Sequence, residues 1–136
     1  MRRLLEENKF TCLVGLVFLV GYSLPGSAIE SVRKANSIFN YILADHLLHF
    51  YTFGIFAFVL GWERGKVSKF YGRQWFAVGA VALGYGLFIE FYQLFLPYRG
   101  TQLGDIGWDV LGIALGLSLA YGFLRWRKKT NPRRSR

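Results

Sequence analysis

Four long apolar segments, separated by short charged stretches, dominate the pattern of this chain. They lie at about residues 10–25, 43–62, 74–96 and 103–124. Apolar runs near the thickness of a bilayer are typical of helices that cross a membrane. The pattern therefore predicts an all-α membrane protein, a four-transmembrane-helix bundle forming a single domain over residues 1–136, with a basic tail at 125–136.

The first segment has two interpretations. It is short for a bilayer core of about 30 Å, and Gly26, Ser27 and Ala28 behind it would suit the cleavage site of a signal peptide. Glu6 and Glu7 are unusual in such a leader, and further apolar segments follow. We therefore expect a retained transmembrane helix, with cleavage as the alternative.

The stretch at residues 26–41 is more polar than its neighbours. At helical spacing Ile29, Val32 and Phe39 share one face, while charged side chains fall on the other. This pattern fits a short helix lying in the membrane interface. It fits a solvated loop equally well, and the sequence does not separate the two.

Composition supports a membrane protein and argues against other classes. A chain of 136 residues that is 53% hydrophobic and 18% aromatic is too apolar for an ordinary soluble domain. The net charge of +9 comes from basic blocks between apolar segments and not from one continuous face, so no nucleic-acid partner is expected. Cys12 is the single cysteine, which excludes an internal disulfide and predicts a buried, inert thiol.

The distribution of Lys and Arg predicts the topology. The N-terminus, the second connection and the C-terminal tail carry three, four and seven of them, against two in the first connection and one in the third. Loops rich in Lys and Arg stay on the cytoplasmic side of a membrane. Both termini are therefore expected in the cytoplasm, with the first and third connections outside.

Ionisable residues interrupt the apolar segments near the ends expected to face outward. Counting helical rise from those ends places His49, Glu90 and Asp109 at a similar depth, roughly 9 to 10 Å. Such residues are rare in lipid and usually face a bundle interior or a wet cavity. The remaining candidates would lie nearer the surface: Asp45, His46, Gln93, Asp105 and, in the outer turn, Arg99. Together they predict an outward-facing polar pocket.

Simpler roles exist for some of these residues. Asp45 and Asp105 could complement the positive N-termini of their helices. Arg99 is a natural counter-charge, since its planar fork suits a carboxylate or a phosphate. The nitrogen and oxygen donors of His49, Glu90 and Asp109 would also suit zinc or another divalent ion, but no strong metal motif supports that set.

Glycines accompany the polar residues on the last two segments. Gly86 follows the same helical face as Glu90, and Gly112 and Gly116 follow that of Asp109. Small residues at this spacing let helix backbones approach closely. We expect such packing here, with a homodimer through the glycine stripes as one use of it.

Three motifs carry a resemblance to a known family. DHLLHF, from Asp45, is similar to a D-K-x-x-H-F pattern, and EFYQLFLPYRG, from Glu90, to E-x-x-Q-x-F-x-P-x-R; DIGWDVLG, from Asp105, is similar to D-x-x-x-N-x-x-G. These patterns, in this order, resemble the VanZ-like family of small bacterial membrane proteins. His46 stands in place of the usual lysine, and Asp109 where an asparagine is common, so the pocket would be more acidic than in a typical member.

The resemblance implies a location and a range of functions. It places the chain in the bacterial inner (cytoplasmic) membrane as a multi-pass protein of the cell envelope. The expected function is binding or processing an envelope molecule, such as a lipid-linked cell-wall precursor, or contributing to glycopeptide (teicoplanin-type) resistance, with which the family's namesake is linked. A non-catalytic structural or assembly partner and a metal-dependent membrane enzyme are the alternatives.

Overall fold

The regular structure of the chain is helical. The computed structural model describes residues 6–25, 27, 34, 45–67, 72–97 and 103–130, and no strand occurs among them. Its helices are, in chain order, α2 (Lys9–Ser23), α5 (Asp45–Val67), α6 (Gly72–Gln93) and α7 (Leu103–Thr130). The prediction of an all-α protein is confirmed for this part of the chain.

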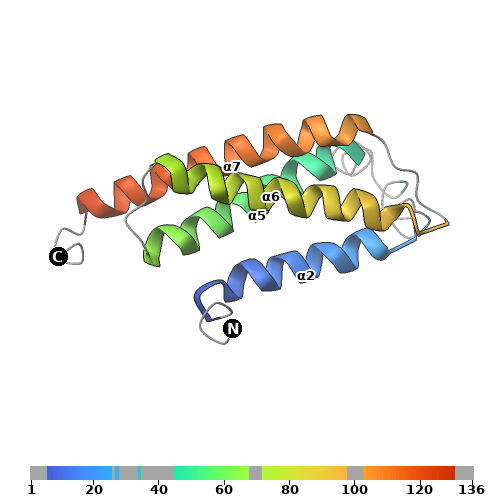
Figure 1. Ribbon diagram of the computed structural model, residues 1–136, viewed down its shortest axis with the longest axis horizontal. Helices are drawn as coiled ribbons and strands as arrows, with labels where there is room; N and C mark the ends of the chain where they lie inside the picture. Colours follow the sequence, from blue (N-terminus) through green and yellow to red (C-terminus); the bar gives the residue numbers. More distant parts are fainter. Residues whose placement is uncertain are drawn as a thin grey trace.

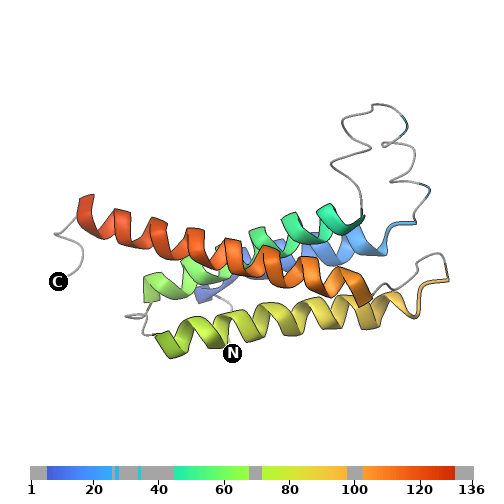
Figure 2. The same cartoon turned by 90° about the horizontal axis from the view of Figure 1, so that it is seen from above.

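The helices form a bundle in which successive elements alternate in direction. Figures 1 and 2 show α2, α5, α6 and α7 lying lengthwise, with the start of α2 and the end of α7 towards the same end. α5 contacts each of the other three helices, most extensively α7. The residues of α5 are therefore the ones best placed to meet side chains from several helices.

The pair α5 and α7 is packed backbone to backbone through glycines. A Cβ built on Gly112 would collide with the carbonyl oxygen of Phe50, and one on Gly116 with the carbonyl oxygen of Gly54. Gly54 itself would bring a Cβ to 3.2 Å from the oxygen of Gly112. These glycines therefore let the backbones of α5 and α7 approach closely within one chain.

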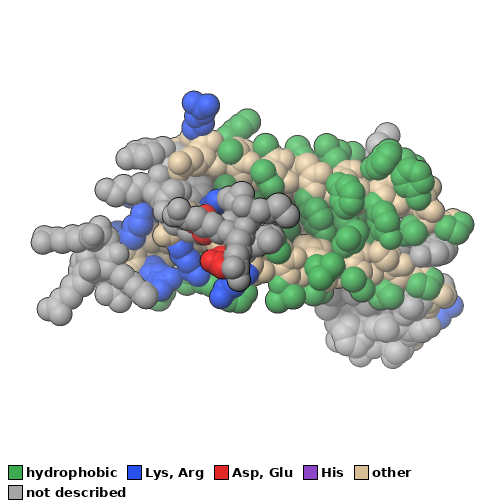
Figure 3. Space-filling model, turned by 60° about the horizontal axis from the view of Figure 1, so that its bottom comes forward, with side chains coloured by type: hydrophobic (Ala, Val, Ile, Leu, Met, Phe, Trp, Pro, Cys, Tyr) green, Lys and Arg blue, Asp and Glu red, His purple; other side chains and the backbone are tan. Residues whose placement is uncertain are grey.

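The interior and the outer surface of the bundle are both apolar. Its core holds Phe53 and Ala57 of α5 with Ala82 and Ile89 of α6, all of them at 0% exposure. Large hydrophobic side chains are also exposed, including Leu16, Ile55, Phe76, Phe91, Leu111 and Leu119. Figure 3 shows hydrophobic side chains over much of the visible surface and charged ones gathered towards one end.

Two helices meet the criteria of length and hydropathy for crossing a membrane. They are α6 and the stretch Gly104–Thr130 within α7, while α2 is a shorter apolar helix. On α2 the thiol of Cys12 is exposed, so the prediction of a buried thiol was wrong. Cys12 lies among exposed apolar neighbours such as Leu13 and Leu16, on a face that the bundle leaves open.

Helix α6 ends earlier than the predicted residue 96. It stops at Gln93, and the chain continues in turns closed by bonds from Leu94 N to Phe91 O (3.3 Å) and from Leu96 N to Gln93 O (3.0 Å). Pro97 explains the early end, because a proline disfavours helical backbone at the preceding residue and has no N–H of its own.

Helices α5 and α7 both run further than predicted. α5 was expected to end at residue 62 and continues to Val67, because Glu63 is buried against α2 and does not lie in a loop. α7 includes residues 125–130 of the expected tail, where Arg125 donates to the hydroxyl of Tyr121 at 3.0 Å. Basic residues in a last turn complement the helix dipole. The expected helix or loop at 26–41 lies outside the described residues, apart from Ser27 and Lys34.

Candidate functional site

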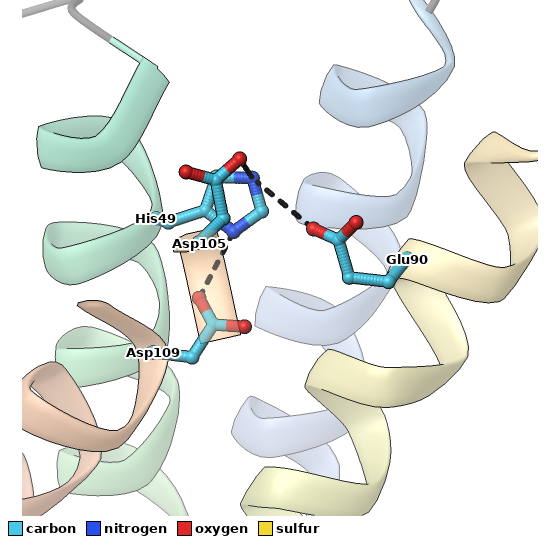
Figure 4. A network of polar contacts seen from close by, with 4 residues as sticks. All are labelled: His49, Glu90, Asp105 and Asp109. Atoms are coloured by element: carbon cyan, nitrogen blue, oxygen red, sulfur yellow. Dashed lines mark hydrogen bonds and ion pairs between the residues drawn. The ribbon is translucent and has the colours of Figure 1, made fainter. Parts of the chain in front are cut away.

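Acidic side chains from α6 and α7 converge on a histidine of α5, as Figure 4 shows. His49 Nδ1 lies 2.9 Å from Asp109 Oδ1. On the other side of the ring, His49 Nε2 lies 3.7 Å from Glu90 Oε1 and 3.9 Å from Asp105 Oδ2. We call this group the carboxylate–histidine cluster: His49, Glu90, Asp105 and Asp109.

The cluster is buried although all of its members can carry charge. The exposed fractions are 4% for His49, 9% for Glu90, 8% for Asp105 and 1% for Asp109. Taking an ion out of water costs several kcal/mol unless partners compensate for it. Each of the three carboxylates around the imidazole therefore needs hydrogen bonds or an opposite charge nearby if it is ionised.

Aromatic rings fix the position of the imidazole. The ring of Tyr22 lies 5.0 Å from that of His49, and the ring of Phe53 lies 5.9 Å from it on the same helix, between centroids. Tyr22 comes from α2, so every helix of the bundle contributes to the surroundings of His49. Nothing in the sequence set Tyr22 apart from the other aromatic residues of its segment.

A glycine provides the space for Asp109. A Cβ on Gly86 would lie 3.0 Å from Asp109 Oδ2 and 3.4 Å from the ring of Phe53. Gly86 was expected to serve close approach of helix backbones. It instead leaves room for a carboxylate side chain from α7.

The hydrogen bonding of the cluster is satisfied on one side of the imidazole and incomplete on the other. An ionised Asp109 can only accept, so His49 Nδ1 donates to it and Nε2 is left to face Glu90 and Asp105. Separations of 3.7 and 3.9 Å are too long for hydrogen bonds. Glu90 Oε1 is buried and has no hydrogen-bond partner. Between α5 and α6 the cluster thus holds a buried carboxylate oxygen without a hydrogen bond.

A second buried glutamate, at the opposite end of α5, is fully paired. Glu63 accepts hydrogen bonds from Phe10 N at 3.1 Å, Thr11 N at 2.9 Å and Thr11 Oγ1 at 2.6 Å. It caps the start of α2, where Asn8 makes no side-chain capping bond. The sequence pattern predicted Glu63 to lie in a connector. It could not predict that a residue of α5 caps the start of α2.

The other candidate residues differ in their relation to the cluster. Gln93 is buried at 3% exposure, close to Glu90 along α6. His46 is exposed, and its ring packs on Trp108 at 5.3 Å between centroids. Asp45 begins α5, but its side chain is outside the described part of the chain, and Arg99 is outside it altogether.

One set of donor atoms in the cluster could hold a metal ion. Single ligand atoms from His49, Glu90 and Asp105 lie within 4.8 Å of one another. The expected ligand set had Asp109 in place of Asp105. The structure instead brings Asp109 to the other nitrogen of the imidazole, where it can orient the ring.

Comparison with known proteins gives one match. The VanZ/LLP1 family model matches residues 8–125, a stretch that contains the whole carboxylate–histidine cluster. No curated protein matches the chain. No solved structure matches it either.

Proposed function

The chain belongs to the VanZ/LLP1 family, and from this membership and the cluster geometry we propose that it binds the polar head of a bacterial envelope molecule. The ligand is a lipid-linked cell-wall precursor or a glycopeptide, and the site is the carboxylate–histidine cluster. Binding there would contribute to glycopeptide resistance or to handling of the precursor.

We propose that all four helices span the bacterial cytoplasmic membrane. At about 1.5 Å per residue, the 23 residues of α5 and the 22 of α6 match a hydrocarbon core of about 30 Å. The 15 residues of α2 fall short of it, and its polar flanks would have to reach the interface. Exposed apolar side chains on every helix support contact with lipid, including Val17, Ile55, Leu87 and Leu115.

The orientation follows from the end of the bundle that carries the basic residues. Lys9 starts α2, Arg64 and Lys66 lie in the last turn of α5, and Arg127 lies in the last turn of α7. The positive-inside rule places this end, with both termini, in the cytoplasm. The cluster is built from the opposite ends of α5 and α7, so it faces outward in this arrangement.

The chemistry of the cluster suits a ligand that donates hydrogen bonds. Ionised carboxylates are acceptors, and bonds to charged groups are stronger than those between neutral groups. Sugar hydroxyls, amide N–H groups and ammonium groups on an envelope precursor or a glycopeptide provide such donors. Glu90 is the best-placed acceptor, since its Oε1 is buried without a hydrogen-bond partner.

An apolar groove on the surface of the bundle supports a ligand with a hydrocarbon tail. It runs between α5 and α7 and is lined by Phe50, Tyr51, Gly54, Ile55, Phe58, Leu115, Gly116 and Leu119. Phe50 directly follows His49 in the chain. The proposed lipid-linked ligand would place its tail along this groove, which begins one residue after His49 on α5.

The observation that carries the proposal is that the buried Glu90 Oε1 has no hydrogen-bond partner. In a network that serves only to hold helices together, the oxygens of a buried carboxylate are expected to be paired, as both oxygens of Glu63 are. A ligand site, in contrast, leaves an acceptor open for the ligand. This difference favours binding over the alternative of a purely structural or assembly role.

The test is a resistance and envelope-stress assay on single variants. His49→Ala, Glu90→Gln and Asp109→Asn should each abolish the phenotype that the wild-type chain confers, while immunoblots show normal accumulation in the membrane. Glu6→Gln, at an exposed position, is the matched control and should keep the phenotype. If all three variants accumulate and keep it as well, the proposal fails.

A further inference from the structure

We propose that the carboxylate–histidine cluster binds a divalent transition-metal ion of the Zn²⁺ type, with His49, Glu90 and Asp105 as ligands. Asp109 acts as a positioning residue through the imidazole. The inference goes beyond the proposed function, which requires only hydrogen-bond acceptors, and metal binding by the purified chain can be measured without any envelope ligand.

The spacing of the donor atoms suits a shared cation. Zinc lies about 2.0–2.2 Å from nitrogen and carboxylate oxygen ligands, so two ligand atoms of one tetrahedral ion are roughly 3.4 Å apart. His49 Nε2 is 3.7 Å from Glu90 Oε1 and 3.9 Å from Asp105 Oδ2. The full set lies within 4.8 Å, so binding a tetrahedral ion would draw the three side chains closer together.

Asp109 completes an arrangement found around metal-bound histidines. Such histidines usually donate their second ring N–H to a carboxylate, which fixes the tautomer and raises the basicity of the ligand nitrogen. Here His49 Nδ1 lies 2.9 Å from Asp109 Oδ1. The lone pair of Nε2 is then directed to the side of Glu90 and Asp105.

A cation also explains the polar atom that the protein leaves unsatisfied. Without one, the Nε2 lone pair of His49 faces two carboxylates in a buried site. A proton on Nε2 would not reach either oxygen at hydrogen-bond distance. A doubly charged ion between the three groups would pair Glu90 Oε1, which is buried and has no hydrogen-bond partner.

The donor set indicates the class of metal. One imidazole nitrogen with carboxylate oxygens suits zinc and its first-row neighbours, whereas magnesium and calcium prefer oxygen alone. Three protein ligands also leave a fourth tetrahedral position free for water or another molecule. We therefore choose Zn²⁺ as the probe.

The experiment is a Zn²⁺ titration of the full-length chain, purified in detergent and stripped with a chelator, in competition with a chromophoric chelator. The wild type should bind about one ion per chain. Glu90→Gln and Asp105→Asn should each weaken binding at least tenfold, and Asp109→Asn should weaken it by about 10- to 100-fold, as other residues that orient ligands do.

A control variant and a second readout keep the test decisive. His46→Ala removes an exposed histidine that packs on Trp108 and should leave the affinity unchanged. Saturating Zn²⁺ should raise the unfolding midpoint of the wild type and not that of Glu90→Gln. Absence of stoichiometric binding to the wild type would overturn the proposal, as would wild-type affinity in folded Glu90→Gln and Asp105→Asn.

Discussion

The side chains of His49 and Asp109 meet at 2.9 Å and join two helices whose backbones are also in contact. His49 lies near the start of α5 and Asp109 near the start of α7, and their exposed fractions are 4% and 1%. The two residues are 60 positions apart in the chain. The same two helices, α5 and α7, are thus joined by this buried hydrogen bond and by the backbone contacts at Gly54, Gly112 and Gly116. Stability and the candidate site therefore depend on some of the same residues.

A double-mutant cycle should detect this link. His49→Ala leaves the buried Asp109 without its hydrogen bond to the imidazole, and Asp109→Ala removes the partner of His49 Nδ1. Breaking a buried pair from one side typically costs about 3–5 kcal/mol of unfolding free energy. The double variant should lose less than the sum, with a coupling of about 1–3 kcal/mol. Denaturant unfolding in detergent gives the unfolding free energies of the wild type, the two single variants and the double variant. Strict additivity would show that the contact contributes nothing to stability.

Removing the cap that α5 supplies to α2 should destabilise the bundle. Glu63→Gln keeps the shape of the side chain but turns an N–H₂ group towards donors of Phe10 and Thr11, so it should cost about 1–3 kcal/mol. Thr11→Val, which removes one of the three bonds, should cost less. Glu6→Gln is the exposed control, expected within about 0.5 kcal/mol of the wild type. Equal stability of Glu63→Gln and Glu6→Gln would rule out the cap.

The close packing of α5 and α7 predicts opposite effects for two glycines of one helix. Gly116→Ala places a methyl group against the backbone of Gly54 and should cost about 3 kcal/mol or more. Gly122→Ala meets no atom within 4 Å and should stabilise the helix by up to about 1 kcal/mol. Thermal unfolding of both variants in detergent provides the comparison. A neutral Gly116→Ala would contradict the backbone contact.

The proposed topology can be tested with alkaline phosphatase fusions. A fusion after Thr101 should be active, because the connection between α6 and α7 is placed outside the membrane. A fusion after Thr130 should be inactive, because the end of α7 is placed in the cytoplasm. Immunoblots control for equal expression. The reverse pattern would overturn the orientation and place the cluster on the cytoplasmic side.

Much of the helix plan could be predicted from the sequence because apolar length and charged breaks are local properties. All four segments correspond to described helices. The ends of α5 and α7 could not be predicted, since they depend on partners from elsewhere in the chain. Glu63 looks like a loop residue until α2 supplies its donors.

Depth along each helix was enough to group His49, Glu90 and Asp109, because rise per residue is nearly constant. Depth alone does not give the rotation of each helix about its axis, which decides towards which neighbour a side chain points. The sequence therefore did not show that Asp105 lies on the Nε2 side of His49 and Asp109 on the Nδ1 side, and it gave no role to Tyr22. A glycine at position 86 indicated that a neighbouring group comes close. That this neighbour is the carboxylate of Asp109 depends on how α7 packs and could not be predicted.

The most direct test of the central claim is the unfolding free energy of Glu90→Gln in the presence of a metal chelator. If Glu90 is held open for a ligand, its carboxylate adds little to stability, and the variant should lie within about 0.5 kcal/mol of the wild type or above it. A loss as large as that of Glu63→Gln, about 1–3 kcal/mol, would contradict the account and assign Glu90 to the structural framework.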